Sequence, residues 1–225
     1  MLQQILFADY HGAGIGARTS LGTAYDDGTG PGTVVLTTTA AVPAGALICV
    51  LVCVGGSETS IGTLADSSLN SYVNAKNASS VVAAIFYVKN ATAMASGHSI
   101  TYTIVTPGNA VAMSAFYVTG INTSAPLDTA VGATATGVSS SATVTSGTPA
   151  VAGELFVAML TTGTPVTITQ DTTHGWASPP NESDVPSSLK VAGGTQVNAG
   201  TGTKIYSPSI STSGWSATVV GFKPA

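Results

Sequence analysis

Residues that could perform catalysis are few and widely separated in this chain. The three histidines are His11, His98 and His174, and none belongs to a His-x-x-x-His metal-binding pair. No serine lies in a Gly-x-Ser-x-Gly nucleophile elbow. The glycine-rich run 11–16 lacks the lysine and the strand–helix context of a phosphate-binding loop. We therefore expect no catalytic residue, no cofactor and no metal ion, and a protein that is not an enzyme.

The aspartates admit two interpretations. Asp26 and Asp27 precede a glycine, as in a turn whose carboxylates accept backbone amides, although a calcium site there is an alternative. Asp66 and Asp171 follow two expected strands at similar places. A turn that closes each strand is the simpler reading, and a shared site for a divalent ion or another ligand is the alternative. The glutamates are scattered, so no carboxylate pair suited to glycoside hydrolysis is visible.

Two tryptophans and one tyrosine could stack on a sugar or pack in a core. Trp176, Trp215 and Tyr72 each lie at a repeat-equivalent or core-facing position, which favours packing. Trp176 is the best surface candidate, because it lies in a loop, 173–181, whose paired prolines prevent a strand from continuing.

The two cysteines lie within one apolar run, 46–54. In a strand, Cys49 and Cys53 point to the same face about 13 Å apart, at ~3.3 Å per residue. A disulfide needs Cα atoms within roughly 7 Å, so these cysteines cannot bridge each other. We expect both to be small buried hydrophobic residues.

The composition predicts an all-β protein with few charges. Only 7% of the 225 residues are charged, and the net charge is −4. No basic stripe is present to neutralise phosphates, which excludes nucleic-acid binding. No apolar run is long enough for a membrane helix, and the first ten residues do not resemble a signal peptide, so we expect synthesis in the cytoplasm. A surface of uncharged hydroxyls suits a subunit covered by neighbours, which predicts a homo-oligomer.

Short apolar or alternating segments, separated by Gly- and Pro-rich turns, indicate many strands. The run 46–54 is apolar throughout, as expected of a central strand buried on both faces. The expected strands are 33–39, 46–54, 60–65, 80–89, 98–105, 110–119, 141–146, 153–161, 165–170, 187–192, 201–207 and 215–222.

The strands repeat at a spacing of about 105 residues. Segment 43–51 matches 151–159, and 112–120 matches 215–222. The repeat predicts two similar halves, 33–121 and 141–225, within a sandwich domain over 33–225, preceded by a Gly-rich N-terminal arm over 1–32. The halves either form separate sandwiches or pair as two sheets of one jelly-roll-like sandwich. We favour the second arrangement, because the apolar faces of the halves need to be covered.

Several segments resemble a family of β-sandwich modules found in tailed-phage virion proteins and in some bacterial surface proteins. These segments are Val42-Pro-Ala-Gly-Ala-Leu-Ile48, Asp66-Ser-Ser-Leu-Asn-Ser-Tyr72 and Ile85-Phe-Tyr-Val-Lys-Asn90, followed by 152–158 and 215–222. The usual middle motif of the family is Asp-Ser-x-Gly-Asn-x-Tyr, and this chain has Leu69 where glycine is expected. The resemblance covers about 33–222 and implies a jelly-roll-like virion component with no catalytic site.

The resulting functional hypothesis is a capsid decoration or cement protein of a tailed phage, located in the virion. Its partners would be the major capsid protein or other virion subunits, contacted through sandwich faces and the N-terminal arm. A carbohydrate- or receptor-binding module of a phage tail or fibre is the alternative. The candidate interaction residues are Leu2, Ile5, Phe7, Tyr10 and Trp176.

Overall fold

All regular structure in the described residues is β-strand. The computed structural model describes residues 14–30, 32–55, 60–79, 82–164, 166–177, 183–185, 189–198 and 200–225. The strands in these ranges pair in antiparallel sheets, which confirms the all-β class. Among the described residues there is no helix long and apolar enough to cross a membrane.

The first half of the chain forms one large and one small sheet. The first large sheet has the order β1 (Thr19–Asp26), β8 (Val111–Val118), β3 (Leu47–Val54), β6 (Val82–Val88) and β5 (Val73–Ser79). The first small sheet has the order β2 (Thr33–Thr37), β7 (Ser99–Thr103) and β4 (Thr63–Asp66).

The second half forms a similar pair of sheets, in which, among the described residues, the large sheet has one strand more and the small sheet one strand fewer than in the first half. The second large sheet has the order β9 (Leu127–Ser141), β16 (Ser209–Phe222), β11 (Glu154–Thr162), β14 (Leu189–Asn198) and β13 (Ser183–Val185). The second small sheet pairs β10 (Val144–Thr145) with β15 (Ile205–Tyr206), and β12 (Ile168–Thr169) pairs with the first residues of β16.

The sequence repeat is therefore also a repeat of strand order. β9, β16, β11, β14 and β13 follow one another as β1, β8, β3, β6 and β5 do. Gly45 and Gly153, which precede the two central strands, share the same left-handed conformation, with φ of 82° and 83°. These matched glycines fix the register, so Leu47 corresponds to Leu155. Each half begins one strand before the residue at which the sequence repeat predicted it to begin. The first half begins with β1, before residue 33, and the second with β9, before residue 141.

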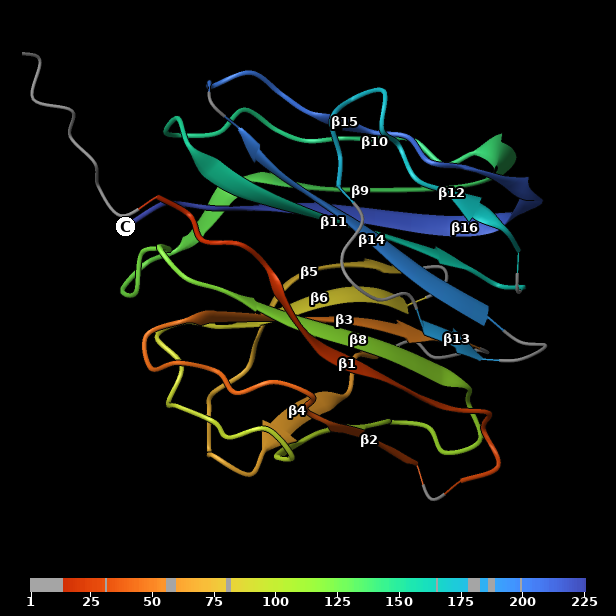
Figure 1. Ribbon diagram of the computed structural model, residues 1–225. Helices are drawn as coiled ribbons and strands as arrows, with labels where there is room; N and C mark the ends of the chain where they lie inside the picture. The colour runs from red at the N-terminus through yellow and green to blue at the C-terminus, as the bar shows by residue number, and fades with distance from the viewer. Residues whose placement is uncertain are drawn as a thin grey trace, which may run out of the picture.

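The four sheets stack in layers (Figure 1). The two large sheets face each other in the middle, and each small sheet covers the outer face of its own large sheet. Three apolar cores fill the three interfaces between layers. The halves thus meet through their large sheets, but neither half is a single sheet of one sandwich, which is the arrangement we favoured. Each half also has a two-layer sandwich of its own, which the expectation of one sandwich with two sheets did not include.

The central strand β3 shows why its sequence is apolar throughout. Ile48, Val50 and Val52 point into the core shared with the first small sheet. Leu47, Cys49 and other alternate residues point into the core between the two large sheets. Both faces of β3 are buried, and the same holds for β11, so neither strand alternates with polar residues.

The N-terminal segment differs from the arm expected over 1–32. Residues 19–26 form β1, an edge strand that pairs with β8 of the same chain. A bulge between Ser20 and Gly22 lets this strand bend, and Gly22 takes a φ of 119° that suits glycine. The segment does not alternate in polarity, which is why its strand was missed. Residues 1–13 lie outside the described part of the chain.

Candidate binding cleft between the two halves

The carboxylate of Asp66 closes a tight turn after β4. It accepts hydrogen bonds from the backbone N–H groups of Ser68 and Asn70, at 2.8 and 3.1 Å. It also accepts the Asn70 amide at 2.9 Å and the Tyr72 hydroxyl at 2.8 Å. Burial, followed by the charge of Asp66, raises the pKa of Tyr72, so the phenol stays a donor. These hydrogen bonds stabilise the charged carboxylate in its buried position, as the turn interpretation predicts.

Asp171 has the corresponding role after β12. Its carboxylate accepts the backbone N–H of Ser207 at 2.7 Å and that of His174 at 3.2 Å. The His174 ring Nδ1 lies 2.8 Å from the same carboxylate. Within the described residues, no group of three or more His, Cys, Asp or Glu side chains is arranged to hold a metal ion. The hydrogen bonds of both aspartates to backbone N–H groups hold their loops in place.

Asp26 and Asp27 also act in a turn. The Asp26 carboxylate accepts the backbone N–H of Gly28 at 2.7 Å. Asp27 accepts both the N–H and the hydroxyl of Thr29, at 3.0 and 2.6 Å, and these bonds lower its pKa. The contacts match the turn interpretation of this pair.

Trp176 is a core residue, not an exposed surface for sugar. Its side chain is 2% exposed, and the indole N–H donates to the backbone oxygen of Ile205 at 2.6 Å. The ring packs edge-on against Tyr206, with centroids 5.0 Å apart. The loop after β12 folds back over the second small sheet and inserts the indole into the core. The prediction that Trp176 is an exposed interaction residue is therefore wrong. Trp215 is also buried, and its indole N–H donates to Ser139.

The other four interaction candidates, Leu2, Ile5, Phe7 and Tyr10, lie outside the described residues.

The cysteines behave as predicted, since Cys49 and Cys53 are buried and unpaired by any disulfide. Burial raises the pKa of both thiols, that of Cys53 to about 12. A thiol with so high a pKa is a poor nucleophile and a poor metal ligand at neutral pH.

A buried pair of carboxyl groups joins the start of β9 to the start of β11. Burial raises the pKa of Glu154 to about 7, and a hydrogen bond with Asp128 adds to this effect. Burial also acts to raise the pKa of Asp128, but hydrogen bonds from the N–H groups of Ala150 and Ala130 bring it below its ordinary value. Burial and the neighbouring carboxyl group therefore favour the protonated form of Glu154, whereas the backbone donors favour the charged form of Asp128. Sequence spacing gave no sign of this pair, because the two residues are far apart in the chain.

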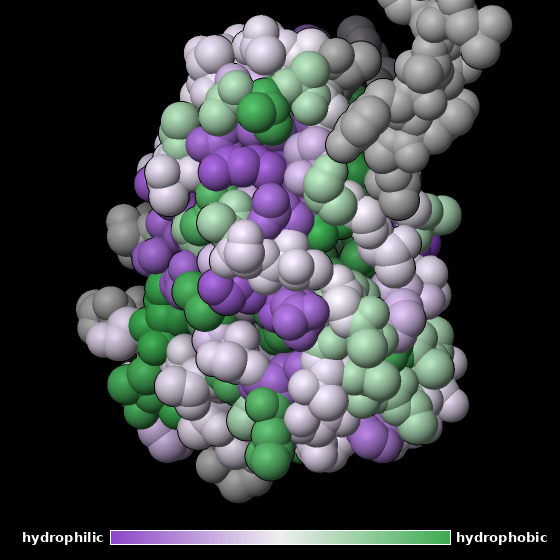
Figure 2. Space-filling model, turned by 90° about the vertical axis from the view of Figure 1, so that its left-hand side faces the viewer, coloured by the Kyte–Doolittle hydropathy of each residue, from purple (hydrophilic) through white to green (hydrophobic). Residues whose placement is uncertain are grey.

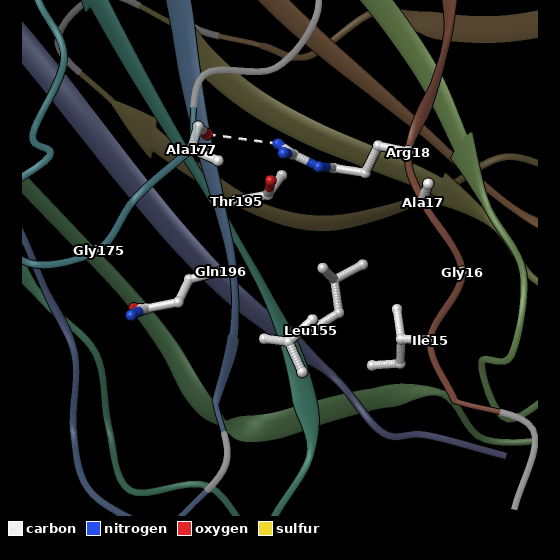
Figure 3. A pocket seen from close by; sticks show the side chains of 10 residues that line it. Ile15, Gly16, Ala17, Arg18, Leu155, Gly175, Ala177, Thr195 and Gln196 are labelled. Carbon is white, nitrogen blue, oxygen red and sulfur yellow. Dashed lines mark hydrogen bonds between the residues drawn. The ribbon is translucent and has the colours of Figure 1, made fainter.

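A cleft of about 500 Å³ opens between the segment that leads into β1 and the edge of the second large sheet (Figure 3). Arg18 lies on one wall, and its Nη1 donates to the backbone oxygen of Ala177 at 3.3 Å. Thr195 of β14 lies beside the guanidinium (Figure 3). The cleft is also lined by Ile15, Gly16, Ala17, Leu155, Gly175, Ala177, Gln196 and Val197.

Two polar atoms of residues that line this cleft are buried and lack a hydrogen-bond partner among the described residues. Thr195 is 2% exposed, and its Oγ1 forms no hydrogen bond within the described structure. The side-chain oxygen of Gln196 is also buried and unpartnered there, although its amide nitrogen donates to the backbone oxygen of His174 at 3.0 Å. Buried polar groups without partners are uncommon in folded proteins, so they mark this cleft as the candidate functional site.

The cleft arises where the two halves differ. Tyr87 pairs with Cys49, and Thr195 pairs with Val157, so Tyr87 and Thr195 are equivalent in the repeat. The Tyr87 ring packs against Phe222 across the interface between the large sheets, with centroids 5.4 Å apart. A threonine at the equivalent position is too short to fill that space. Sequence reasoning missed the site, because it depends on which side chains meet across the two halves.

Comparison of the chain with protein-family models, with curated proteins and with solved structures gave no match.

Proposed function

We propose that this protein is a structural subunit of a tailed-phage virion, of the capsid decoration or cement type, that joins its neighbours through the free edge of β9. β9 spans Leu127–Ser141, and in the described part of the chain it pairs with β16 alone. An unpaired strand edge offers a row of backbone donors and acceptors to another chain. This edge is the observation that carries the proposal.

The composition of β9 supports a role in assembly. From residue 129 to residue 141 the strand contains no charged residue, and Val138 is 78% exposed. Proteins that must stay monomeric commonly protect such an edge with lysine, proline or a bulge. The equivalent edge strand β1 is shorter and carries the bulge at Gly22. The pairing of β9 with β16 has register shifts on both sides of its middle, but it is regular from residue 133 to residue 139.

The rest of the surface fits a covered subunit. Pale residues of near-neutral hydropathy make up much of the face in Figure 2, among smaller purple and green groups. Few charges make contacts between subunits rather insensitive to salt, and symmetry in a lattice multiplies weak contacts.

We also assign each half to the jelly-roll type, which is common in viral capsid proteins. In a jelly roll, the first, eighth, third and sixth strands share one sheet, and the second, seventh and fourth lie in the other. The strands of the first half have the orders 1-8-3-6 and 2-7-4, which supports the assignment. β5 departs from the pattern, because it pairs with β6 and not with β4.

The first test asks whether the protein is part of a particle. Phage particles purified from the source culture are labelled with a gold-conjugated antibody against this chain and imaged by electron microscopy. We expect gold on the particle heads. Particles that contain none of the chain by mass spectrometry would overturn the proposal.

The second test addresses the β9 edge itself. Val138→Lys places a charge on this edge, and it should abolish or strongly weaken incorporation into particles. Val105→Lys is the matched control, because Val105 is also exposed, at 53%, but lies in the loop after β7. Equal incorporation of both variants would remove the β9 edge from the mechanism.

A further inference from the structure

β9 offers the longest regular sheet edge in the described part of the chain. Its pairing with β16 has no register shift from residue 133 to residue 139. The other edges of the two large sheets are shorter. The regular part of β1 covers 22–26, that of β5 covers 76–79, and β13 is only Ser183–Val185. Among these edges, β9 is therefore the best template for a strand of another chain.

The edge is covered at one end and open beyond it. The N–H of Gly147 donates to the backbone oxygen of Val131 at 2.9 Å, so the segment after β10 covers the start of β9. From residue 133 to residue 139, no described strand pairs with β9 on the side away from β16. We call 133–139 the open stretch.

The open stretch is uncharged, and its side chains are small. It reads Ala133-Thr-Ala-Thr-Gly-Val-Ser139. Like charges that lie directly opposite each other destabilise a pair of strands, and this stretch has none. Two copies of a chain with a net charge of −4 can therefore meet at this edge without local repulsion.

The open stretch is complementary to its own reversed copy. Thr136 is its middle residue, so an antiparallel copy with Thr136 opposite Thr136 pairs the whole stretch, and any other register leaves part of it unpaired. Thr134, Thr136 and Val138 are exposed on one face, where Thr134 lies opposite Val138 of the copy. A cross-strand pair of threonines stabilises such a contact.

The opposite face of the open stretch also accepts a second copy. Ala135 lies there opposite Gly137 of the copy, and both residues are small. The Trp215 ring lies over Gly137, where a β-carbon would come within 2.8 Å of it. The glycine keeps the backbone flat beneath the ring, so no side chain of β9 obstructs the new strand at this position.

We propose that two copies of this chain pair through their β9 edges, antiparallel about a twofold axis at Thr136, so that their second large sheets form one continuous sheet. The inference rests on the proposed role of the β9 edge as an interface, and it names the partner at that edge. A twofold interface uses the same patch of both subunits. The backbone donors and acceptors of the two open stretches then pair with each other.

The first test is a charge exchange at Thr136, followed by sedimentation velocity of the full chain. The parent should form dimers. Thr136→Lys and Thr136→Glu should each weaken dimerisation by at least about tenfold, because each places like charges opposite each other. An equimolar mixture of the two variants should dimerise again. Thr103→Lys and Thr103→Glu, at an exposed threonine of β7, are the matched controls and should dimerise as the parent does.

The second test measures the register by disulfide formation under mild oxidation. Thr136→Cys should cross-link to itself, since side chains directly opposite in a sheet are close enough for a disulfide. Thr134→Cys should not, because two copies of residue 134 would lie about 13 Å apart along the strands. A mixture of Thr134→Cys with Val138→Cys should cross-link. The native cysteines are buried, and the parent chain gives the background.

The outcomes separate this inference from the virion role. A parent chain that stays monomeric at about 1 mM would overturn the dimer, and so would equal cross-linking of Thr136→Cys and Thr134→Cys. If that chain were nevertheless present in particles, the virion role would stand and another protein would occupy the β9 edge. Dimers with the expected register, from a chain that particles lack, would support the pairing and reject the virion role.

Discussion

Tyr87 and Thr195 occupy equivalent positions in the two halves, but only the ring of Tyr87 bridges the two large sheets. Tyr87 packs edge-on against Phe222 at an interplanar angle of 60°, with 8% of the tyrosine exposed. Thr195 leaves its space open, and the cleft that contains Arg18 occupies that end of the interface. One end is therefore closed by an aromatic pair, and the other contains the cleft.

Tyr87→Ala should lower the free energy of unfolding by about 3 kcal/mol, because it deletes a buried ring and leaves a cavity beside Phe222. Urea unfolding followed by tryptophan fluorescence measures the change. Tyr25→Ala is the control, since Tyr25 is 55% exposed and its loss should cost less than about 0.5 kcal/mol. Equal effects of the two substitutions would mean that Tyr87 does not hold the halves together.

Thr195→Val should raise the free energy of unfolding of the protein by about 1 kcal/mol, because it removes an unpartnered buried hydroxyl at constant shape. Thr162→Val provides the contrast. Thr162 is also buried, but its hydroxyl donates to the Thr164 oxygen at 2.7 Å, so its removal should cost about 1 kcal/mol. The same urea titration applies, and a loss of stability in Thr195→Val would contradict the assignment of that hydroxyl as unpartnered.

The buried pair Asp128 and Glu154 should make stability fall as pH rises. The pKa of Glu154 is raised in the folded state to about 7, so the folded protein binds this proton more tightly than the unfolded chain does. The stabilisation is fully present below the ordinary pKa of a glutamate, and it is lost as pH rises toward and through 7. The decrease should be on the order of 2 kcal/mol.

Comparison with Glu154→Gln isolates this proton. Glutamine keeps an N–H donor for Asp128 but does not titrate, so the variant should lose less stability than the parent between about pH 4.5 and pH 7, the range from the ordinary pKa to the raised pKa of Glu154. The lowered pKa of Asp128 acts in the opposite sense, and its contribution is lost only as pH falls below the ordinary range of an aspartate. Parallel pH profiles of parent and variant would show that Glu154 titrates normally.

Leu69→Gly should stabilise the protein by up to about 1 kcal/mol. Leu69 is 92% exposed and has a φ of 60°, a left-handed conformation that costs a residue with a Cβ about 1–2 kcal/mol. Glycine adopts it without strain, although the greater freedom of the unfolded chain offsets part of the gain. Gly45→Ala is the opposite substitution, at a glycine with a φ of 82°, and it should lower the stability of the folded protein. A thermal unfolding scan compares the two variants, and a lower Tm for Leu69→Gly would contradict the prediction.

The strands that can be predicted are those that face an apolar core. Each expected strand overlaps an observed one, and the runs at β3 and β11 are apolar because both of their faces are buried. The strands that sequence analysis missed are β1, β5, β9 and β13, which form the four edges of the two large sheets. An edge strand is paired on one side only and is more open to solvent, so its residues need not alternate in polarity.

By itself, the sequence determined the all-β class, the repeat, the unpaired buried cysteines and the aspartate turns. The class, the cysteines and the turns depend on composition or on residues close together in the chain, and the repeat depends only on comparing one half of the sequence with the other. The tertiary structure decided that the large sheets face each other, that Trp176 is buried, and that Asp128 meets Glu154. It also decided that Thr195 leaves a cleft beside Arg18 where Tyr87 fills the equivalent space. These features depend on side chains that meet across separate sheets, and no local pattern specifies which side chains those are.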